Sequence, residues 1–152
     1  MSDTQATGAR TKTIWMMGHR ATLIPCGEHY FALDITTPAG VPGPPPHFHE
    51  DSEEMFHVLG GSLEVRSGDQ WLRLEAGESL TVPRGGVHTF RNPTDTDVRW
   101  LTGWNPLGFQ EWFGLYGVDA LEPDARDRSV SEEVIGRAVE ACAGFGMVIV
   151  DG

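Results

Sequence analysis

The side chains best suited to chemistry gather in one short stretch of the chain. Between residues 46 and 56, His47 and His49 are followed by Glu54. Side chains alternate along a strand, so the two histidines are expected on the same face. Two imidazoles on one face can bind a single transition-metal ion, and a carboxylate from the next strand can supply a third ligand. This spacing predicts a metal site.

Glu53 is the competing carboxylate. Glu54 shares a strand face with Phe56 and Val58, which are expected to point inward, and Glu53 belongs to the other face. We therefore expect Glu54 to be the ligand. His57 lies on the face opposite Glu54, where a packing or dimer role is expected.

A second stretch supplies a fourth candidate ligand. Pro83 and Gly85 predict a tight turn, and His88 follows it at the start of a new strand, with Phe90 and Asn92 on its face. Asn92 is expected to close its strand through a turn. His19 and His29 have no motif around them and are assigned no role in the site.

Short strands must position these residues. The sequence has 19 Gly and 10 Pro, which recur between apolar alternations, so many strands joined by tight turns are expected. The pattern favours an all-β barrel or sandwich of the double-Greek-key type. The expected strands are residues 13–17, 21–25, 29–36, 53–66 as a strand pair with a reversal or bulge at Gly60-Gly61, 70–75, 78–82, 87–92 and 98–104.

The pattern changes after residue 105. Aromatic residues at helical spacing predict a helix over residues 109–116, followed by a charged linker over 121–128. Ser129 and Glu132 have the spacing of a capping box, so a second helix is expected to begin there. Residues 147–150 are a candidate edge strand. We therefore expect a disordered tail (1–12), a barrel (13–105) and a C-terminal helical extension packed on the barrel (106–152).

Charge and composition limit the partners. The net charge is −11, whereas nucleic acids and anionic membranes are bound by basic surfaces. We expect neither as a partner. Residues 1–12 lack the apolar run of a signal peptide, and no stretch of the sequence is long and apolar enough to cross a bilayer. Cys26 and Cys142 are expected to be reduced thiols. A cytoplasmic protein is the expectation.

The two stretches resemble the two sequence signatures of the cupin superfamily. The first signature is met by His47, His49, Glu54 and Gly61, with Val41 in place of the family's leading glycine. The second is met at all of its positions, by Gly77, Pro83, Gly85, His88 and Asn92. The resemblance implies a jelly-roll barrel, the double-stranded β-helix, in which His47, His49, Glu54 and His88 bind one divalent metal. Mn, Fe, Ni, Co, Cu and Zn all occur in the family, and these ligands do not choose among them.

The C-terminal aromatic helix is similar to that of single-domain cupins of the quercetin-dioxygenase-like subgroup. This similarity implies a dioxygenase that acts on a small organic molecule, with Glu54 as the catalytic base. A metal-dependent cyclase, isomerase or decarboxylase that uses no oxygen is the second hypothesis, and a cupin that binds a small molecule without turnover is the third. Phe90 is expected to face the metal cavity. Trp100 and Trp104 are candidate pocket residues if their strand face is the inner one, and core or dimer residues if it is not.

The family resemblance also implies a homodimer. Many cupins pair barrel faces or exchange N-terminal strands, and residues 13–17 are the candidate for such an exchange.

Overall fold

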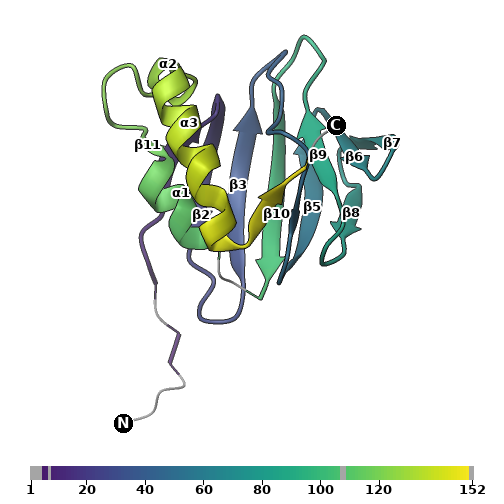
Figure 1. Ribbon diagram of the computed structural model, residues 1–152, viewed down its shortest axis with the longest axis horizontal. Helices are drawn as coiled ribbons and strands as arrows, with labels where there is room; N and C mark the ends of the chain where they lie inside the picture. Colours follow the sequence, from purple (N-terminus) through teal and green to yellow (C-terminus); the bar gives the residue numbers. More distant parts are fainter. Residues whose placement is uncertain (1–4, 7, 107–108, 151–152) are drawn as a thin grey trace.

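The computed structural model of this chain describes residues 5–6, 8–106 and 109–150. These residues form two antiparallel sheets in a jelly-roll arrangement, with short helices after the last long strand (Figure 1). The predicted all-β class and barrel type are confirmed. The first strand begins at Lys12, and residues 1–4 and 7 of the predicted tail lie outside the described residues.

The larger sheet has seven strands in the order β11-β1-β2-β3-β10-β5-β8. Its strands are β1 (Lys12–Met16), β2 (His19–Ile24), β3 (Phe31–Thr37), β5 (Glu53–Gly60), β8 (Ser79–Val82), β10 (Val98–Asn105) and β11 (Val118–Asp119). Strand β1 pairs with β2 on one side and with β11 on the other. The predicted exchange of this strand between two copies stays a prediction.

The smaller sheet has five strands in the order β12-β4-β9-β6-β7. Its strands are β4 (His47–His49), β6 (Ser62–Ser67), β7 (Gln70–Glu75), β9 (His88–Arg91) and β12 (Met147–Ile149). Strand β12 is the predicted C-terminal edge strand, and it pairs with β4. Residues 147–149 are thereby placed beside the two histidines of β4.

Strict alternation along the central strands builds the interior between the sheets. Every second side chain of β10 is buried, from Val98 through Trp100 and Thr102 to Trp104. Strands β3 and β5 flank β10 and alternate in the same way. Full burial of one large apolar side chain contributes about 1.5–3 kcal/mol, so this inner face stabilises the barrel as well as shaping its cavity.

Gly60-Gly61 does not fold the chain back on itself. Strands β5 and β6 were expected to form a pair, but they belong to different sheets, so this part of the prediction is wrong. Gly61 has a φ of +79°, and a Cβ at this position would lie 2.7 Å from the carbonyl oxygen of Asp97. The glycine therefore allows the chain to cross closely under a neighbouring segment from one sheet to the other.

The helices lie together at one end of the barrel, beside β2 and β11 (Figure 1). They are α1 (Gln110–Tyr116), α2 (Ala125–Ser129) and α3 (Glu132–Ala141), followed by a 3₁₀ turn, η1 (Cys142–Phe145). The predicted aromatic helix is confirmed by α1. The expected linker contains α2, which the sequence analysis missed.

The second predicted helix begins two residues later than expected. Its N-cap is Ser131, whose Oγ accepts a hydrogen bond from the backbone N–H of Val134 at 3.3 Å. Ser129 instead ends α2, and its hydroxyl accepts from Gly18 and donates to the carbonyl of Arg126. Two serines stand near the boundary, and tertiary contacts decide which of them caps the helix.

None of the helices in the described part of the chain has the length and apolar character needed to span a bilayer. Cys26 and Cys142 are both free thiols, as expected.

Candidate metal centre

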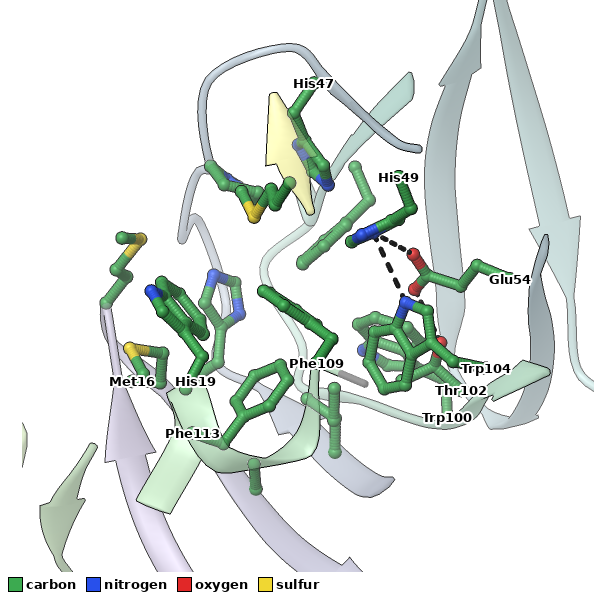
Figure 2. Close-up of a pocket in the computed structure, with 17 residues that line it drawn as sticks. Met16, His19, His47, His49, Glu54, Trp100, Thr102, Trp104, Phe109 and Phe113 are labelled. Atoms are coloured by element: carbon green, nitrogen blue, oxygen red, sulfur yellow. Dashed lines mark hydrogen bonds and ion pairs between the residues drawn. The ribbon is translucent and has the colours of Figure 1, made fainter. Parts of the chain in front are cut away.

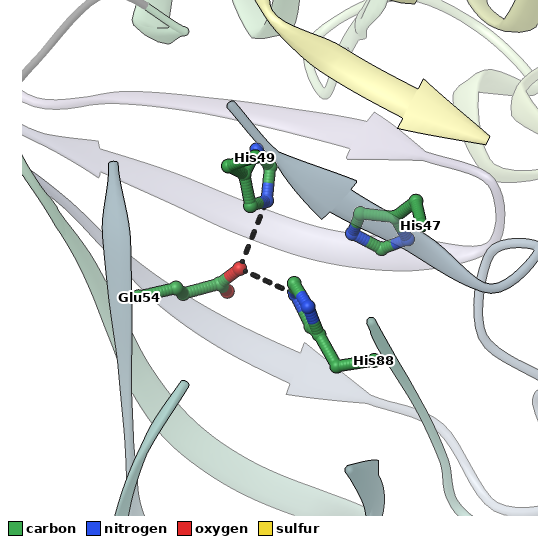
Figure 3. Close-up of side chains that lie close together, drawn as sticks. All are labelled: His47, His49, Glu54 and His88. Carbon is green, nitrogen blue, oxygen red and sulfur yellow. Dashed lines mark hydrogen bonds and ion pairs between the residues drawn. The ribbon is translucent and has the colours of Figure 1, made fainter. Parts of the chain in front are cut away.

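Three neighbouring strands bring the four predicted ligands together. His47 and His49 lie on β4, Glu54 at the start of β5 and His88 at the start of β9. His47 is the direct cross-strand partner of His88. Glu54 comes from the other sheet, so the cluster joins the two layers of the barrel (Figure 3).

We call these residues, His47, His49, Glu54 and His88, the four-residue cluster. One potential ligand atom from each lies within 4.8 Å of all the others. All four side chains are buried, none being more than 4% exposed. Glu53 is exposed, so of the two neighbouring carboxylates it is Glu54 that the structure places beside the histidines.

Backbone carbonyls orient two of the imidazoles. Nδ1 of His47 lies 2.8 Å from the carbonyl oxygen of Pro45, and Nδ1 of His88 lies 2.9 Å from that of Gly86. A carbonyl only accepts, so each Nδ1 carries the proton and donates it. In the neutral rings, Nε2 then holds a free electron pair, which is the state that a metal requires.

The close contact between His88 and Glu54 is stable only with a positive charge between the two side chains. Nε2 of His88 lies 3.0 Å from Oε1 of Glu54, and Nε2 of His49 lies 3.1 Å from the same oxygen. A bare imidazole nitrogen and a carboxylate oxygen repel each other at this distance unless a proton or a metal ion lies between them. The donor set is therefore that of a site for one divalent transition metal, which would be held by the four-residue cluster.

In the metal-free protein, burial and the contacts within the cluster shift the pKa values of its residues. Burial lowers the pKa of His47 from 6.5 to about 3, and the neighbouring His88 adds to this effect. Burial by itself raises the pKa of Glu54, but hydrogen bonds from His49 and His88 outweigh it and hold this pKa well below its usual value. For His88, burial opposes the charged form, yet the hydrogen bond to Glu54 raises its pKa. The cluster thus keeps Glu54 as a carboxylate.

Thr102 holds the second oxygen of the carboxylate. Its hydroxyl donates to Oε2 of Glu54 at 2.6 Å, while Oε1 faces the two histidines. The sequence analysis named only Trp100 and Trp104 on this strand face and gave no role to Thr102, which lies between them. A polar residue at the centre of an aromatic strand face was the available signal.

Three residues of the cluster, His47, His49 and Glu54, line a cavity with mostly apolar walls (Figure 2). The cavity volume is about 60 Å³, less than half of the roughly 150 Å³ of an engineered cavity that binds benzene. Trp100 and Trp104 line it, so their strand face is the inner one, and Phe90 lines it as well. In this conformation the cavity suits a small molecule.

Two aromatic residues near the start of α1 cover the cavity on the helical side. Phe109 packs edge-on against His49, with the ring centroids 5.0 Å apart, and against Trp104, with the ring centroids 5.7 Å apart. Phe113 packs against Trp104 at 5.6 Å. The C-terminal extension therefore contributes directly to the surroundings of the cluster.

His19 is a cavity residue that the sequence analysis left without a role. It is buried, lines the cavity and packs edge-on against Phe90. Nε2 of His19 lies 3.1 Å from the carbonyl of Pro42, so it carries the proton, and Nδ1 accepts from Thr37 at 3.0 Å. Burial lowers the pKa of His19 to about 4, which keeps the ring neutral.

Val41 stands where the first cupin signature has a glycine, and neighbouring glycines take over the role of that residue. The backbone N–H of Val41 donates to the carbonyl of Pro38, and Gly40 between them has a φ of +74°. The backbone of Gly43 packs closely against that of Phe90, since a Cβ at Gly43 would lie 1.7 Å from the carbonyl oxygen of Phe90. Glycines on either side of Val41 therefore supply the turn and the close approach.

Sequence comparison finds matches for the part of the chain that holds the cluster. Residues 34–104, which include the whole four-residue cluster, match the family described as Cupin domain. Protein SchB from Streptomyces halstedii is 36% identical over 78 residues, which are 51% of this chain and 55% of SchB. Tetracenomycin polyketide synthase protein TcmJ from Streptomyces glaucescens is 34% identical over 61 residues, which are 40% of this chain and 41% of TcmJ. The matches span about half or less of the length of these relatives.

Solved structures share the fold at low identity. An RmlC-like cupin from Shewanella frigidimarina NCIMB 400 has a TM-score of 0.58 and 21% identity, over 70% of this chain and 93% of that one. A sugar phosphate isomerase from a cupin superfamily, from Silicibacter pomeroyi DSS-3, has a TM-score of 0.56 and 18% identity, over 61% and 62% of the two chains. This likeness shows a shared fold, and together with the match over residues 34–104 it supports a single small cupin domain in this chain.

Proposed function

We propose that this chain is a metal-dependent enzyme that acts on a small, mostly apolar organic molecule bearing a hydroxyl or carbonyl oxygen. One observation carries the proposal. The ligand atoms of the buried four-residue cluster lie within 4.8 Å of one another, and three of its residues, His47, His49 and Glu54, line an aromatic cavity. A metal ion placed there can meet a substrate away from bulk water.

The proposed roles of the residues follow from their positions. A bound divalent metal would supply Lewis acidity, which makes a substrate hydroxyl, or a C–H next to a carbonyl, easier to deprotonate. Glu54 is the proposed base, because it is the carboxylate of the cluster and lines the cavity. Phe90, Trp100 and Trp104 are the proposed walls of the substrate pocket, and the aromatic covering on α1 keeps water out.

We favour proton transfer without oxygen, as in an isomerase or cyclase. TcmJ is by name a polyketide synthase protein, and polyketide chains are rich in enolisable carbonyls. In such a reaction Glu54 takes a proton from a carbon next to a carbonyl and returns it to another atom of the substrate. The proton balance closes within the molecule, so no oxidant is required.

The dioxygenase predicted from the aromatic tail is the alternative chemistry for the same cavity. A closed apolar site also suits oxygen chemistry, because it protects a reactive substrate anion from water. The small volume of the cavity argues against a molecule as large as a flavonol in this conformation. The alternatives differ in one measurable quantity, the oxygen consumed per substrate lost.

The test begins with the metal content of protein purified without chelator. The loaded protein is then incubated with 1,3-diketones, enediols and flavonols, and substrate loss and oxygen uptake are recorded together. Substrate loss without oxygen uptake supports the proposal. Uptake of one oxygen molecule for each substrate molecule lost supports a dioxygenase. Glu54→Gln should abolish turnover, while Glu53→Gln, which alters an exposed neighbour, should not. Retained metal without turnover of any of these compounds would favour the binding protein and contradict the enzyme.

The homodimer also stays a prediction, and light scattering of the purified chain tests it.

A further inference from the structure

We infer that the indole N–H of Trp104 donates a hydrogen bond to an oxygen atom of the molecule that binds beside the four-residue cluster. This inference rests on the proposed function and narrows its substrate class. The cavity would select compounds that present an acceptor oxygen next to an apolar body, such as small phenols, enols and carbonyl compounds. Hydrocarbons and organic cations would be excluded.

The position of Trp104 is set by strand register. It lies on β10 directly opposite Glu54 on β5 and opposite Phe31 on β3. Its side chain is 4% exposed, and its ring stacks on Phe31 with the centroids 5.3 Å apart. Phe113 packs against the same ring at 5.6 Å. The direction of the indole N–H is therefore held by packing.

The partner of this N–H is a nitrogen of the cluster itself. Nε1 of Trp104 lies 3.3 Å from Nε2 of His49, and that nitrogen also lies 3.1 Å from Oε1 of Glu54 (Figure 2). An imidazole nitrogen either carries a proton or offers one electron pair. It therefore cannot donate to Glu54 and accept from Trp104 at the same time.

A bound metal resolves this conflict for His49 and creates a free donor on Trp104. Once the electron pair of Nε2 is given to a metal, the indole N–H loses its acceptor. Among the described residues no buried side-chain nitrogen or oxygen lacks a partner, so this donor would then be an exception. Leaving a buried donor unpaired is costly, and an oxygen of a ligand in the cavity removes that cost.

The indoles of two other buried tryptophans are already paired away from the cluster. Nε1 of Trp100 donates to Oγ1 of Thr37 at 3.0 Å. Nε1 of Trp112 donates to the carbonyl of Ala138 on α3 at 2.9 Å. Neither acceptor is a metal ligand, so metal binding leaves both bonds intact. Trp104 differs from them in having its donor directed at the metal centre.

The experiment compares two probes on cobalt-loaded protein. Acetohydroxamate binds metals through oxygen and keeps electron pairs for a donor, whereas imidazole binds through nitrogen and offers no acceptor to the indole. Affinities are measured from the visible absorption of Co(II). Trp104→Phe keeps a ring but removes the N–H, and it should weaken acetohydroxamate binding about tenfold, with cobalt and imidazole affinities unchanged. Trp112→Phe, which removes a buried N–H that faces α3, should leave the ratio of the two probe affinities unchanged.

Three results would overturn the inference. They are unchanged acetohydroxamate affinity in Trp104→Phe, an equal loss for both probes in that variant, or the same selective loss in Trp112→Phe. If the wild-type chain binds no cobalt, the proposed function fails as well. If it binds cobalt and Trp104→Phe behaves as wild type, only the inference fails.

A second measurement does not depend on the folding of any variant. In zinc-loaded wild-type protein, acetohydroxamate should shift the indole N–H proton resonance of Trp104 downfield. The corresponding resonance of Trp112 should stay in place. A stationary Trp104 resonance at saturating acetohydroxamate would contradict the proposed hydrogen bond.

Discussion

The hydroxyl of Thr102 donates to Oε2 of Glu54 at 2.6 Å, on the opposite side of the carboxylate from the two histidines. This contact comes from β10, the strand next to the one that carries Glu54. It fixes the rotation of the carboxylate and leaves Oε1 directed at the centre of the cluster. Residues that orient metal ligands in this way usually affect metal affinity strongly.

Thr102→Val replaces the hydroxyl with a methyl group of similar size. We expect it to weaken metal binding about 10- to 100-fold, because Glu54 loses the partner that orients it. Competition with a chromophoric chelator measures the affinity. Thr102→Ser keeps the hydroxyl and should bind within a few-fold of wild type. A valine variant with wild-type affinity would show that the contact is dispensable.

Metal binding should stabilise the folded chain. At a free zinc concentration about 100 times the Kd, binding adds about 2.7 kcal/mol to the free energy of unfolding. A chain of this size should then unfold roughly 5–10 °C higher. Chelator should reverse the shift, and Glu54→Gln should abolish it at the same zinc concentration. Glu53→Gln is the matched control and should respond as wild type, because Glu53 is exposed. A full zinc shift in Glu54→Gln would exclude this carboxylate as a ligand.

His19 should make stability depend on pH. Its pKa is about 4 in the folded chain and 6.5 ordinarily, so the unfolded chain takes up this proton first as the pH falls. The free energy of unfolding therefore decreases as the pH falls from about 6.5 to about 4. The contribution of His19 between about pH 7 and about pH 4.5 is about 2 kcal/mol.

Denaturant unfolding in the presence of chelator checks this pH dependence. His19→Gln should lose stability less steeply with falling pH than wild type, whatever its stability at neutral pH. His29→Gln, at an exposed histidine, should keep the wild-type slope. Equal slopes for wild type and His19→Gln would mean that the buried imidazole is not neutral in the folded chain.

Gly43 should tolerate no side chain. A Cβ there would lie 1.7 Å from the carbonyl oxygen of Phe90, a backbone atom that cannot move away cheaply. We expect Gly43→Ala to cost about 3 kcal/mol or more, or to prevent folding. At Gly60 a Cβ would meet nothing within 4 Å, so Gly60→Ala is the control and should change stability little. Similar unfolding midpoints for the two variants would contradict the close approach.

The sequence by itself determined the residues of the four-residue cluster and the class of fold. Strand side chains alternate with a period of two, so the spacing of His47 and His49 placed both on one face, and the apolar partners of Glu54 separated it from Glu53. The turn at Pro83 and Gly85 placed His88 at the start of a strand. These are relationships over a few residues, which local backbone geometry transmits directly.

Tertiary structure decided what depends on contacts between distant segments. The chain passes from one sheet to the other at Gly61, where it approaches the backbone of Asp97 closely. Ser131 caps α3, whereas the hydroxyl of Ser129 accepts a hydrogen bond from the backbone N–H of Gly18. The same is true of the hydroxyl of Thr102, the buried ring of His19 and the indole of Trp104. Local sequence patterns show that a side chain faces inward, but only the packed sheets determine which atom it meets there.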